Sequence, residues 1–441
     1  MGIPIGDKRR RRRRRSYADY KPRSRRQGPR DDPFRIVFYL VLIAGALWVY
    51  FNPDVVRGWI EGEIGELPLI ASSGETAPQT DAEGTAAEAE DRPLSPEELA
   101  ARAEEAYLSG NLDEAIDLYQ QAADAAPNTV DYPFQVARLL LFKTAMQYGE
   151  AREATLEEAL NAANMAILAD PESPAGYAIM GKVMDWSERP EDASSQILRA
   201  LEIDENYALG QSYLAEALVD LDRWDQAQQT IEKALALDPN SVDIRRDYAY
   251  ILESLGDYAG AATQYEAALR IHPRLAFLHV ALGRVYRVLG RYDEALDAFF
   301  EAETIEPENA LIQFEVGLTY ETFIGDPASA TEFYERAVEL DEEFAAPWVR
   351  LGTIRYLQGS YSQAAPALER ALALGQDNDD IYYRLGLSYA NMGQCENALP
   401  YLREAQNRFA EDEELLAVIV ETIEVCTTPT PTAVPTQDTG N

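Results

Sequence analysis

A 34-residue period constrains the fold of this chain more than any other feature of its sequence. Six residues between positions 290 and 307 recur at the same offsets 34 positions earlier. They are Gly290, Tyr292, Ala295, Phe299, Ala302 and Pro307, which correspond to Gly256, Tyr258, Ala261, Tyr265, Ala268 and Pro273. A fixed period of about 20–50 residues indicates a repeat architecture, in which each unit packs against its neighbours in chain order.

The repeat extends over most of the chain. The position that closes each unit falls at Pro127, Pro171, Glu205, Pro239, Pro273, Pro307, Glu342, Gln376 and Ala410. This series predicts nine units between residues 95 and 412. Most intervals are 34 residues, but the first is 44 and one is 35. The long interval predicts an insertion around residues 142–155, and the single extra residue falls within residues 323–327.

Each unit has the pattern of two amphipathic helices joined by a tight turn. The first unit begins at Ser95, which is placed to cap a helix with Pro96 at its first position and Glu98 three residues after the cap. Gly290 suits the left-handed conformation that ends a first helix, and Pro307 stops the second helix. The small and aromatic residues between these two positions are therefore predicted to be core residues.

These in-phase copies resemble the tetratricopeptide repeat family, and the resemblance covers roughly three-quarters of the chain. It implies an all-α fold, a right-handed superhelix (an α-solenoid) of about nine helix-turn-helix repeats whose first helices line a concave groove. The apolar residues after position 412 predict a C-terminal capping helix over residues 413–426. Together with an N-terminal anchor, the pattern is similar to that of membrane-anchored bacterial members of the family.

The resemblance also implies which residues face a bound partner. The groove positions of the family fall on Arg246, Tyr250, Glu253, Phe277, Arg284, Arg287, Phe314, Glu321, Tyr356, Tyr383 and Asn391. Arginine and aromatic residues are enriched at binding hot spots. The arginines at 246, 284 and 287 therefore suggest a site for an acidic peptide or a C-terminal carboxylate. The alternative is that these arginines pair with neighbouring carboxylates along the groove.

The N-terminal region predicts a membrane anchor. Residues 1–33 hold thirteen Lys or Arg against four Asp, a net charge of +9, while the whole chain carries −37 and the remainder therefore −46. Such a segment is predicted to be a disordered tail. The apolar run 36–51 and its flanks predict a transmembrane signal-anchor helix over residues 34–56. A cleaved signal peptide is the alternative, which the bulky aromatic end of the run disfavours.

The charge asymmetry predicts the orientation of this anchor. By the positive-inside rule the basic tail lies in the cytoplasm and the repeats lie outside it, in a single-pass cell membrane protein. We expect the tail to contact anionic lipid, and nucleic acid is a less favoured partner. Residues 57–94 are small and acidic and predict a flexible linker, and the Thr/Pro-rich residues 427–441 predict a disordered tail.

The chain has two cysteines, Cys395 and Cys426. They lie almost equally far from the turn predicted near Ala410, so antiparallel packing of the ninth unit's second helix and the capping helix brings the thiols together. In an oxidising compartment this predicts a disulfide that holds the cap in place. The alternative is that each cysteine is a small apolar residue that fills its own site.

The sequence contains no motif for catalysis. It has no glycine-rich phosphate loop, HExxH, GxSxG or paired CxxC motif, and it predicts no cofactor and no metal site. Its two histidines, His272 and His279, have no suitably spaced ligand partner, which favours ordinary roles on the helix surface. We therefore expect a non-enzymatic scaffold that binds a protein or peptide partner outside the cytoplasm. The alternatives are a module that binds a glycan or envelope polymer and an accessory subunit of an envelope enzyme complex.

Overall fold

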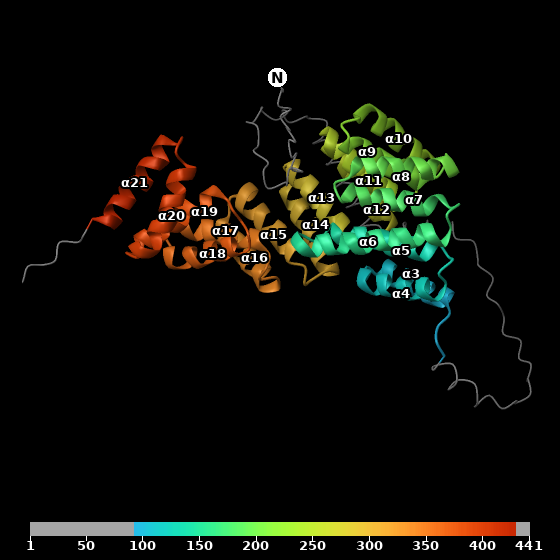
Figure 1. The fold of residues 1–441 in the computed structure, drawn as a ribbon, viewed down its shortest axis with the longest axis horizontal. Helices are drawn as coiled ribbons and strands as arrows, with labels where there is room; N and C mark the ends of the chain where they lie inside the picture. The colour runs from blue at the N-terminus through green and yellow to red at the C-terminus, as the bar shows by residue number, and fades with distance from the viewer. Residues whose placement is uncertain (1–91, 429–441) are drawn as a thin grey trace, which may run out of the picture. The chain divides into compact units, whose positions relative to one another are not determined.

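The computed structural model describes residues 92–428, which contain nineteen α-helices, one π-helical turn and no strand (Figure 1). The helices are α3 (Pro96–Ser109), α4 (Leu112–Ala125), α5 (Asp131–Thr144), α6 (Gly149–Ala169), α7 (Pro174–Trp186), α8 (Pro190–Ile203), α9 (Ala208–Asp220), α10 (Trp224–Leu237), α11 (Val242–Leu255), α12 (Tyr258–Ile271), α13 (Ala276–Val288), α14 (Tyr292–Ile305), α15 (Ala310–Thr319), the π turn η2 (Tyr320–Ile324), α16 (Pro327–Leu340), α17 (Ala345–Leu357), α18 (Tyr361–Ala373), α19 (Asp379–Asn391), α20 (Cys395–Arg408) and α21 (Glu413–Thr427).

The helices from α3 to α20 form nine consecutive pairs, and each first helix packs most extensively against its own second helix. This pairing confirms the predicted all-helical repeat fold. Four successive first helices have glycine at the point of closest approach. A Cβ atom added to Gly283, Gly317, Gly352 or Gly386 would lie 2.6–2.7 Å from a side-chain atom of the second helix. These positions have no room for a side chain, so the repeat retains glycine there.

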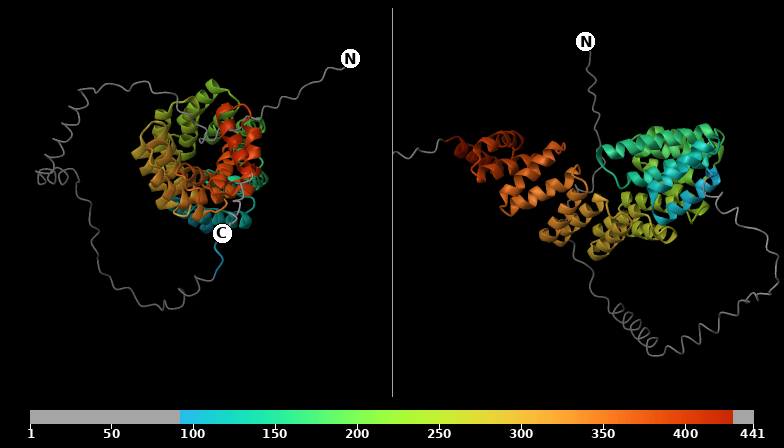
Figure 2. Two further views of the ribbon diagram at one scale, coloured as in Figure 1. Left: turned by 90° about the vertical axis from the view of Figure 1, so that its left-hand side faces the viewer. Right: turned by 90° about the horizontal axis from the view of Figure 1, so that it is seen from below.

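The stack curves toward its first helices. Consecutive first helices contact one another at α5–α7, α7–α9, α9–α11, α13–α15, α17–α19 and α19–α21. Consecutive second helices make no contact of similar extent among the described residues. The first helices therefore lie on the inner side of the curve. Figure 2 shows the curved stack of helices from two further sides. We call this inner surface the first-helix face.

The irregular intervals in the repeat have local structural causes. The first unit starts with the predicted capping box, in which the Ser95 side chain accepts from the backbone N–H of Glu98 and the Glu98 side chain accepts from that of Ser95. The 44-residue interval accommodates a second helix, α6, of 21 residues, longer than its counterparts. The single extra residue is absorbed by the π turn η2, which ends at Gly325 with φ 81°. Insertion of one residue into a helix is the usual origin of such a turn.

The curvature brings the first two helix pairs against helices far along the chain, through what we call the cross-stack contacts. Arg138 on α5 pairs with Asp243 on α11 at 2.8 Å, and Phe142 stacks on Phe277 of α13 with ring centroids 4.7 Å apart. Tyr148 stacks on Phe344 at 3.8 Å and donates a hydrogen bond to Asp341. Backbone carbonyls take part as well, since Arg274 donates to the carbonyl of Ser109. Helix α5 therefore lies against the first-helix face of the middle repeats.

His272 belongs to these contacts, and its predicted role on the helix surface is wrong. The residue follows α12 and is 2% exposed, with its ring centroid 4.3 Å from that of Tyr107 on α3. Its Nε2 lies 3.0 Å from the carbonyl oxygen of Tyr107, so Nε2 carries the proton and donates it. His279 lies on α13, where its Nε2 donates to the carbonyl of Pro273 at 2.9 Å. The repeat pattern marks both positions as ordinary because it carries no information on contacts between distant repeats.

The last described helix, α21, is joined to the ninth pair by a disulfide between Cys395 and Cys426, with the Cα atoms 5.1 Å apart. This is the pairing expected from the sequence. The two cysteines are 31 residues apart, and closing a loop of this size stabilises a folded chain by about 2–4 kcal/mol. Only Ile419 of α21 is buried, so the covalent link contributes a large share of what holds this helix in place.

No helix within residues 92–428 is long and apolar enough to cross a membrane. The predicted basic tail (1–33), the transmembrane segment (34–56), the linker up to residue 91 and the C-terminal tail from residue 429 lie outside the described residues.

Burial makes the contact at His272 dependent on pH. Desolvation lowers the pKa of the imidazole, an effect to which the nearby Arg138 adds, although the hydrogen bond to Tyr107 and the charge of Glu104 oppose it. The unfolded chain, with a pKa of about 6.5, therefore takes up a proton first as the pH falls. His272 adds stability above that pH, and this stability is lost as the pH drops through the lower folded-state pKa.

We therefore expect His272→Gln to reduce the loss of stability that the wild-type chain undergoes between about pH 7 and pH 5. Urea unfolding midpoints at the two pH values measure the difference. His279→Gln, at the other histidine, is the control and should keep the wild-type dependence. An unchanged dependence in His272→Gln would show that this contact does not titrate as described.

Candidate functional site

The predicted groove residues all lie on first helices or on η2, but the structure does not gather them into one site. Those at 246, 250 and 253 are on α11, those at 277, 284 and 287 on α13, and Phe314 and Glu321 on α15 and η2. Tyr356 is on α17, and Tyr383 and Asn391 are on α19. The first-helix face divides into a filled part from α7 to α15 and an accessible part from α17 to α21.

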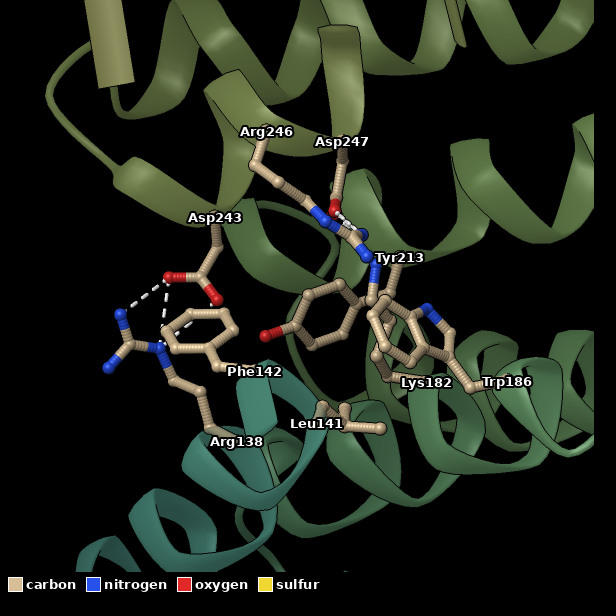
Figure 3. A pocket seen from close by; sticks show the side chains of 9 residues that line it. All are labelled: Arg138, Leu141, Phe142, Lys182, Trp186, Tyr213, Asp243, Arg246 and Asp247. Carbon is tan, nitrogen blue, oxygen red and sulfur yellow. Dashed lines mark hydrogen bonds and ion pairs between the residues drawn. The ribbon is translucent and has the colours of Figure 1, made fainter. Parts of the chain in front are cut away.

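In the filled part, charged side chains are buried and lie against one another (Figure 3). Lys182 on α7 lies 2.6 Å from Glu216 on α9 and 2.8 Å from Asp247 on α11. Arg246 lies 2.7 Å from Glu216 and 2.6 Å from Asp247. Two cations therefore neutralise two carboxylates across three consecutive first helices. We call these four residues the buried quartet.

Polar and aromatic neighbours complete the hydrogen bonding of the quartet. Trp186 Nε1 donates to Glu216 at 2.7 Å, and the Ser212 hydroxyl donates to Asp247 at 2.7 Å. The Arg246 guanidinium lies over the Trp186 ring at 4.5 Å, and Lys182 Nζ lies over the Tyr213 ring at 4.7 Å. When buried charges have all their hydrogen-bonding partners, they help to specify a single packing arrangement. A buried charge without a partner would lower the stability of the fold.

Burial raises the pKa of Asp247, although the charges of Lys182 and Arg246 oppose this effect. Burial by itself raises the pKa of Glu216, but the charges of Arg246 and Lys182 outweigh burial and hold that pKa well below its usual range. Tyr213 lies between the Arg138–Asp243 pair and Lys182, as Figure 3 shows. The cavity lined by these residues measures about 10 Å³, which is room for about one water molecule. The cavity around the quartet therefore has no space for a peptide.

The other two arginines of the predicted basic cluster are also paired. Arg284 and Arg287 on α13 each lie 2.7 Å from the carboxylate of Glu315 on α15. Burial raises the pKa of Glu315, and the two arginines more than offset this effect and lower it. All three arginines therefore follow the alternative in which they pair with neighbouring carboxylates along the face.

Five further predicted groove residues fix one helix against another. Phe277 and Phe314 are buried, and Phe314 packs on Phe344 with ring centroids 5.2 Å apart. The others take part in hydrogen bonds between side chains: Tyr250 donates to Asp220 at 2.9 Å, Glu253 accepts from Tyr265 at 2.6 Å, and Glu321 accepts from Tyr334 at 2.7 Å. These residues stabilise the repeat rather than present a surface.

The accessible part carries a row of aromatic rings. Tyr356 on α17 meets Tyr383 on α19 edge to face at 6.2 Å, and Tyr383 meets Phe409 in the same way at 5.5 Å. All three are partly exposed. Asn391, at the end of α19, is exposed and donates to the carbonyl of Leu387. Rings that are partly covered and held by their neighbours offer rigid contact area to a partner at low entropic cost.

Two arginines beside this row were not identified from the sequence. Arg350 on α17 and Arg384 on α19 occupy equivalent positions 34 residues apart. In α13, Arg284 is neutralised by Glu315, which lies 31 residues later on the next first helix. Aligned on Gly317, Gly352 and Gly386, Arg350 and Arg384 lie two residues before the glycine, at the position of Glu315 rather than that of Arg284. The position of Arg284, one residue after the glycine, holds Thr353 and Leu387 in these helices. The ion pair between α13 and α15 is therefore not repeated in this part of the face.

The two arginines have weaker or more local partners instead. Arg350 lies 3.8 Å from Glu321, and Arg384 pairs with Asp380 on its own helix at 2.9 Å. The Nε–H group of Arg384 is covered and has no acceptor among the described residues. Aligning the repeats in columns would have revealed both arginines from the sequence, because the column that holds Glu315 in α15 holds arginine in α17 and α19.

The remaining features do not build a second site of this kind. A cleft of about 580 Å³ lies between the α3–α4 turn and the loops before α13 and α15, lined by side chains of both charges such as Lys143 and Glu306. Among residues 92–428, no group of three or more His, Cys, Asp or Glu side chains is arranged to hold a metal ion.

Sequence models of one repeat type match the chain. A tetratricopeptide repeat model matches residues 214–276 and 280–347, a TPR repeat model matches residues 352–393, and another tetratricopeptide repeat model matches residues 379–411. Mouse protein O-mannosyl-transferase TMTC1 is 40% identical to the chain over 75 residues. That stretch is 17% of this chain and only 8% of the mouse protein.

Several solved structures are similar to the chain at low identity. A structure of pilF from Pseudomonas aeruginosa has a TM-score of 0.43 at 20% identity and covers 49% of this chain and 98% of its own. A chain of the APC/C hetero-tetramer Cut9–Hcn1 has a TM-score of 0.46 at 15% identity, with 76% of each chain covered. YrrB, described as a TPR protein with an unusual peptide-binding site, has a TM-score of 0.36 at 24% identity and covers 43% and 97% of the two chains.

The buried quartet leads to a prediction about stability. Glu216→Gln leaves Lys182 and Arg246 with one carboxylate between them, and breaking a buried ion pair in this way costs about 3–5 kcal/mol. Glu294→Gln is the matched control, because Glu294 forms an exposed pair with Arg291 and such pairs contribute about 0–1 kcal/mol. Urea unfolding of both variants gives the comparison. Similar losses for the two would mean that the quartet is not a stabilising element.

Proposed function

Because the chain belongs to the tetratricopeptide repeat family, we propose that it is a non-enzymatic scaffold that binds an acidic segment of a protein partner. The binding surface is the accessible part of the first-helix face, with Tyr356, Tyr383 and Phe409 as the aromatic row and Arg350 and Arg384 beside it. The filled part of the face, with its paired arginines, precedes this surface along the stack and takes no ligand.

The interruption in the charge pairing carries this proposal. In the filled part, cations meet a carboxylate of a neighbouring first helix within 2.6–2.8 Å. Arg350 lies 3.8 Å from Glu321 of η2, and Arg384 pairs with Asp380 of its own helix. The side chains of Arg350 and Arg384 are 29% and 16% exposed. Carboxylates from a partner complete the pattern, and bidentate arginine–carboxylate pairs are strong and directional. The aromatic row alone would also suit a glycan, but the arginines beside it favour a carboxylate.

The location of the scaffold is a second part of the proposal. The apolar segment 34–56 anchors the chain in a membrane, the basic residues 1–33 face the cytoplasm and anionic lipid, and the repeats lie on the other side. The Cys395–Cys426 disulfide supports this orientation, since disulfides persist in oxidising compartments.

Protease protection tests the orientation. In intact cells an externally added protease should degrade the repeats and leave a short N-terminal fragment, whereas permeabilised cells should lose that fragment too. Extraction of the chain by high salt or carbonate would contradict anchoring by a membrane-spanning segment, and protection of the repeats in intact cells would contradict the orientation.

Binding to a peptide array tests the partner chemistry. We expect the full chain to select peptides rich in Asp and Glu with an aromatic or aliphatic neighbour, and Arg384→Glu to weaken that binding by about tenfold or more. Arg350→Glu should act in the same direction, and Tyr383→Ala should weaken binding without changing the preference for acidic sequences.

The matched control is Arg336→Glu on the second helix α16, where the arginine side chain is 57% exposed and pairs loosely with Glu339. This change alters the net charge equally but leaves the first-helix face unchanged. If Arg336→Glu weakened binding as much as Arg384→Glu, general charge would explain the result and the proposed surface would be wrong. Selection of glycans in place of peptides would favour the alternative of a glycan-binding module.

A further inference from the structure

Helix α21 is a first helix whose second helix is not present among the described residues. It packs on α19 and α20 in the position of a tenth first helix. Leu415, Ile423 and Cys426 pack with the buried Ile419 against the preceding pair. The residues after α21 include Pro429, Pro431 and Pro435, which do not suit the interior of a second helix.

The ninth pair shows which residues of α21 would face such a helix. On α19, Tyr382 lies under the Arg408 guanidinium of α20 at 4.2 Å, and Gly386 closely approaches Leu402 of α20. The equivalent positions 34 residues later are Leu416 and Val420. Both are partly exposed, and neither packs into a core cluster of the described residues. With Thr427 they form one stripe of the helix, which we call the α21 strip.

The α21 strip differs from the preceding first helices at the glycine position, where the two helices of a pair approach most closely. Four successive first helices have glycine at this position because a Cβ atom would lie 2.6–2.7 Å from the second helix. Helix α21 has Val420 instead, so a second helix of the usual kind cannot pack here at the usual distance. The side chains of Val420 and Leu416 form an apolar surface that protrudes from the helix. This surface suits a binding partner other than a second helix of the repeat.

The charge around the strip restricts that occupant. Glu413 and Glu424 border it, and α21 contains four glutamates and no lysine or arginine. Two copies of the strip would bring these carboxylates together, which disfavours a second copy of the chain. Residues 428–441 contain no Lys or Arg to neutralise them. Basic residues that flank an apolar stripe are the complement of this surface.

We propose that the α21 strip binds an amphipathic helix of a partner protein whose apolar face is flanked by lysine or arginine. Within residues 92–428 no second helix packs on the strip, and the disulfide between Cys395 and Cys426 holds α21 in place. The surface lies on the opposite flank of α21 from Val418 and Val425 and is independent of the arginine–tyrosine surface on α17 and α19. An acidic partner and a basic helix therefore bind to different sites on one scaffold.

Binding of a designed peptide to the full chain tests this proposal. The probe is a peptide of about 18 residues, or five helical turns, with leucine at helical spacing and lysine on either side. The comparison peptide has the same composition in scrambled order. We expect the Leu416→Glu/Val420→Glu variant to bind the helical probe about tenfold or more weakly than the wild type. The scrambled peptide should bind the wild-type chain more weakly by a similar factor.

Val425→Glu is the matched control, because Val425 is 69% exposed on another side of the same helix. It adds the same kind of charge to α21 and should leave affinity within about twofold. Hydrogen exchange of α21 in each variant shows whether the helix remains folded. Equal loss in Val425→Glu, or equal affinity for the scrambled peptide, would overturn the proposal. So would sedimentation as a dimer that Leu416→Glu/Val420→Glu dissociates, because the occupant would then be a second copy.

Discussion

The close approach of each first helix to its own second helix determines most of this structure. Glycine at positions such as 283 and 386 lets the two axes come near enough for Phe299 or Leu402 to cover the backbone of the first helix. Neighbouring pairs meet mainly where a second helix packs on the following first helix. Consecutive first helices also contact one another, whereas consecutive second helices make no contact of similar extent, so the stack curves toward the first helices. The curvature brings α5 against the middle repeats, where residues more than a hundred positions apart, such as Arg138 and Asp243, form an ion pair. A repeat surface that would be accessible in a straighter stack becomes a core.

The pairing of charged side chains on the first-helix face also follows from the curvature of the stack. Side chains that point from successive first helices into a narrow interior lose water, and an unpaired charge there would cost several kcal/mol. The buried quartet and the Glu315 pairs resolve this by alternating cations and carboxylates between neighbouring helices. Where the alternation ends, at Arg350 and Arg384, the face is also accessible. The division between a filled part and an accessible part is therefore a division in electrostatics as well as in space.

The sequence predicted the helices, the turns and the interruptions of the repeat. The 34-residue period located the helices and their turns, and its interruptions located the long α6 and the π turn at Tyr320–Ile324. The disulfide was also predictable, because Cys395 and Cys426 lie on neighbouring antiparallel helices. Contacts across the stack were not predictable, since they depend on small rotations that accumulate over many repeats. For that reason His272 was assigned to the surface. The pairing of the arginines of α11 and α13 with carboxylates of adjacent first helices was the alternative to a ligand site. Arg350 and Arg384, whose signal lies in the repeat columns, were missed.

The central claim is that the first-helix face is filled by the chain itself from α7 to α15 and accessible to an acidic partner at α17 and α19. Hydrogen exchange of the full chain, with and without a glutamate-rich synthetic peptide that carries one phenylalanine, tests it most directly. The account predicts new protection of amides in α17, α19 and the α20–α21 loop, with the exchange of α9, α11 and α13 unchanged. Protection or opening of α11 and α13 on binding, with α17 and α19 unaffected, would contradict it.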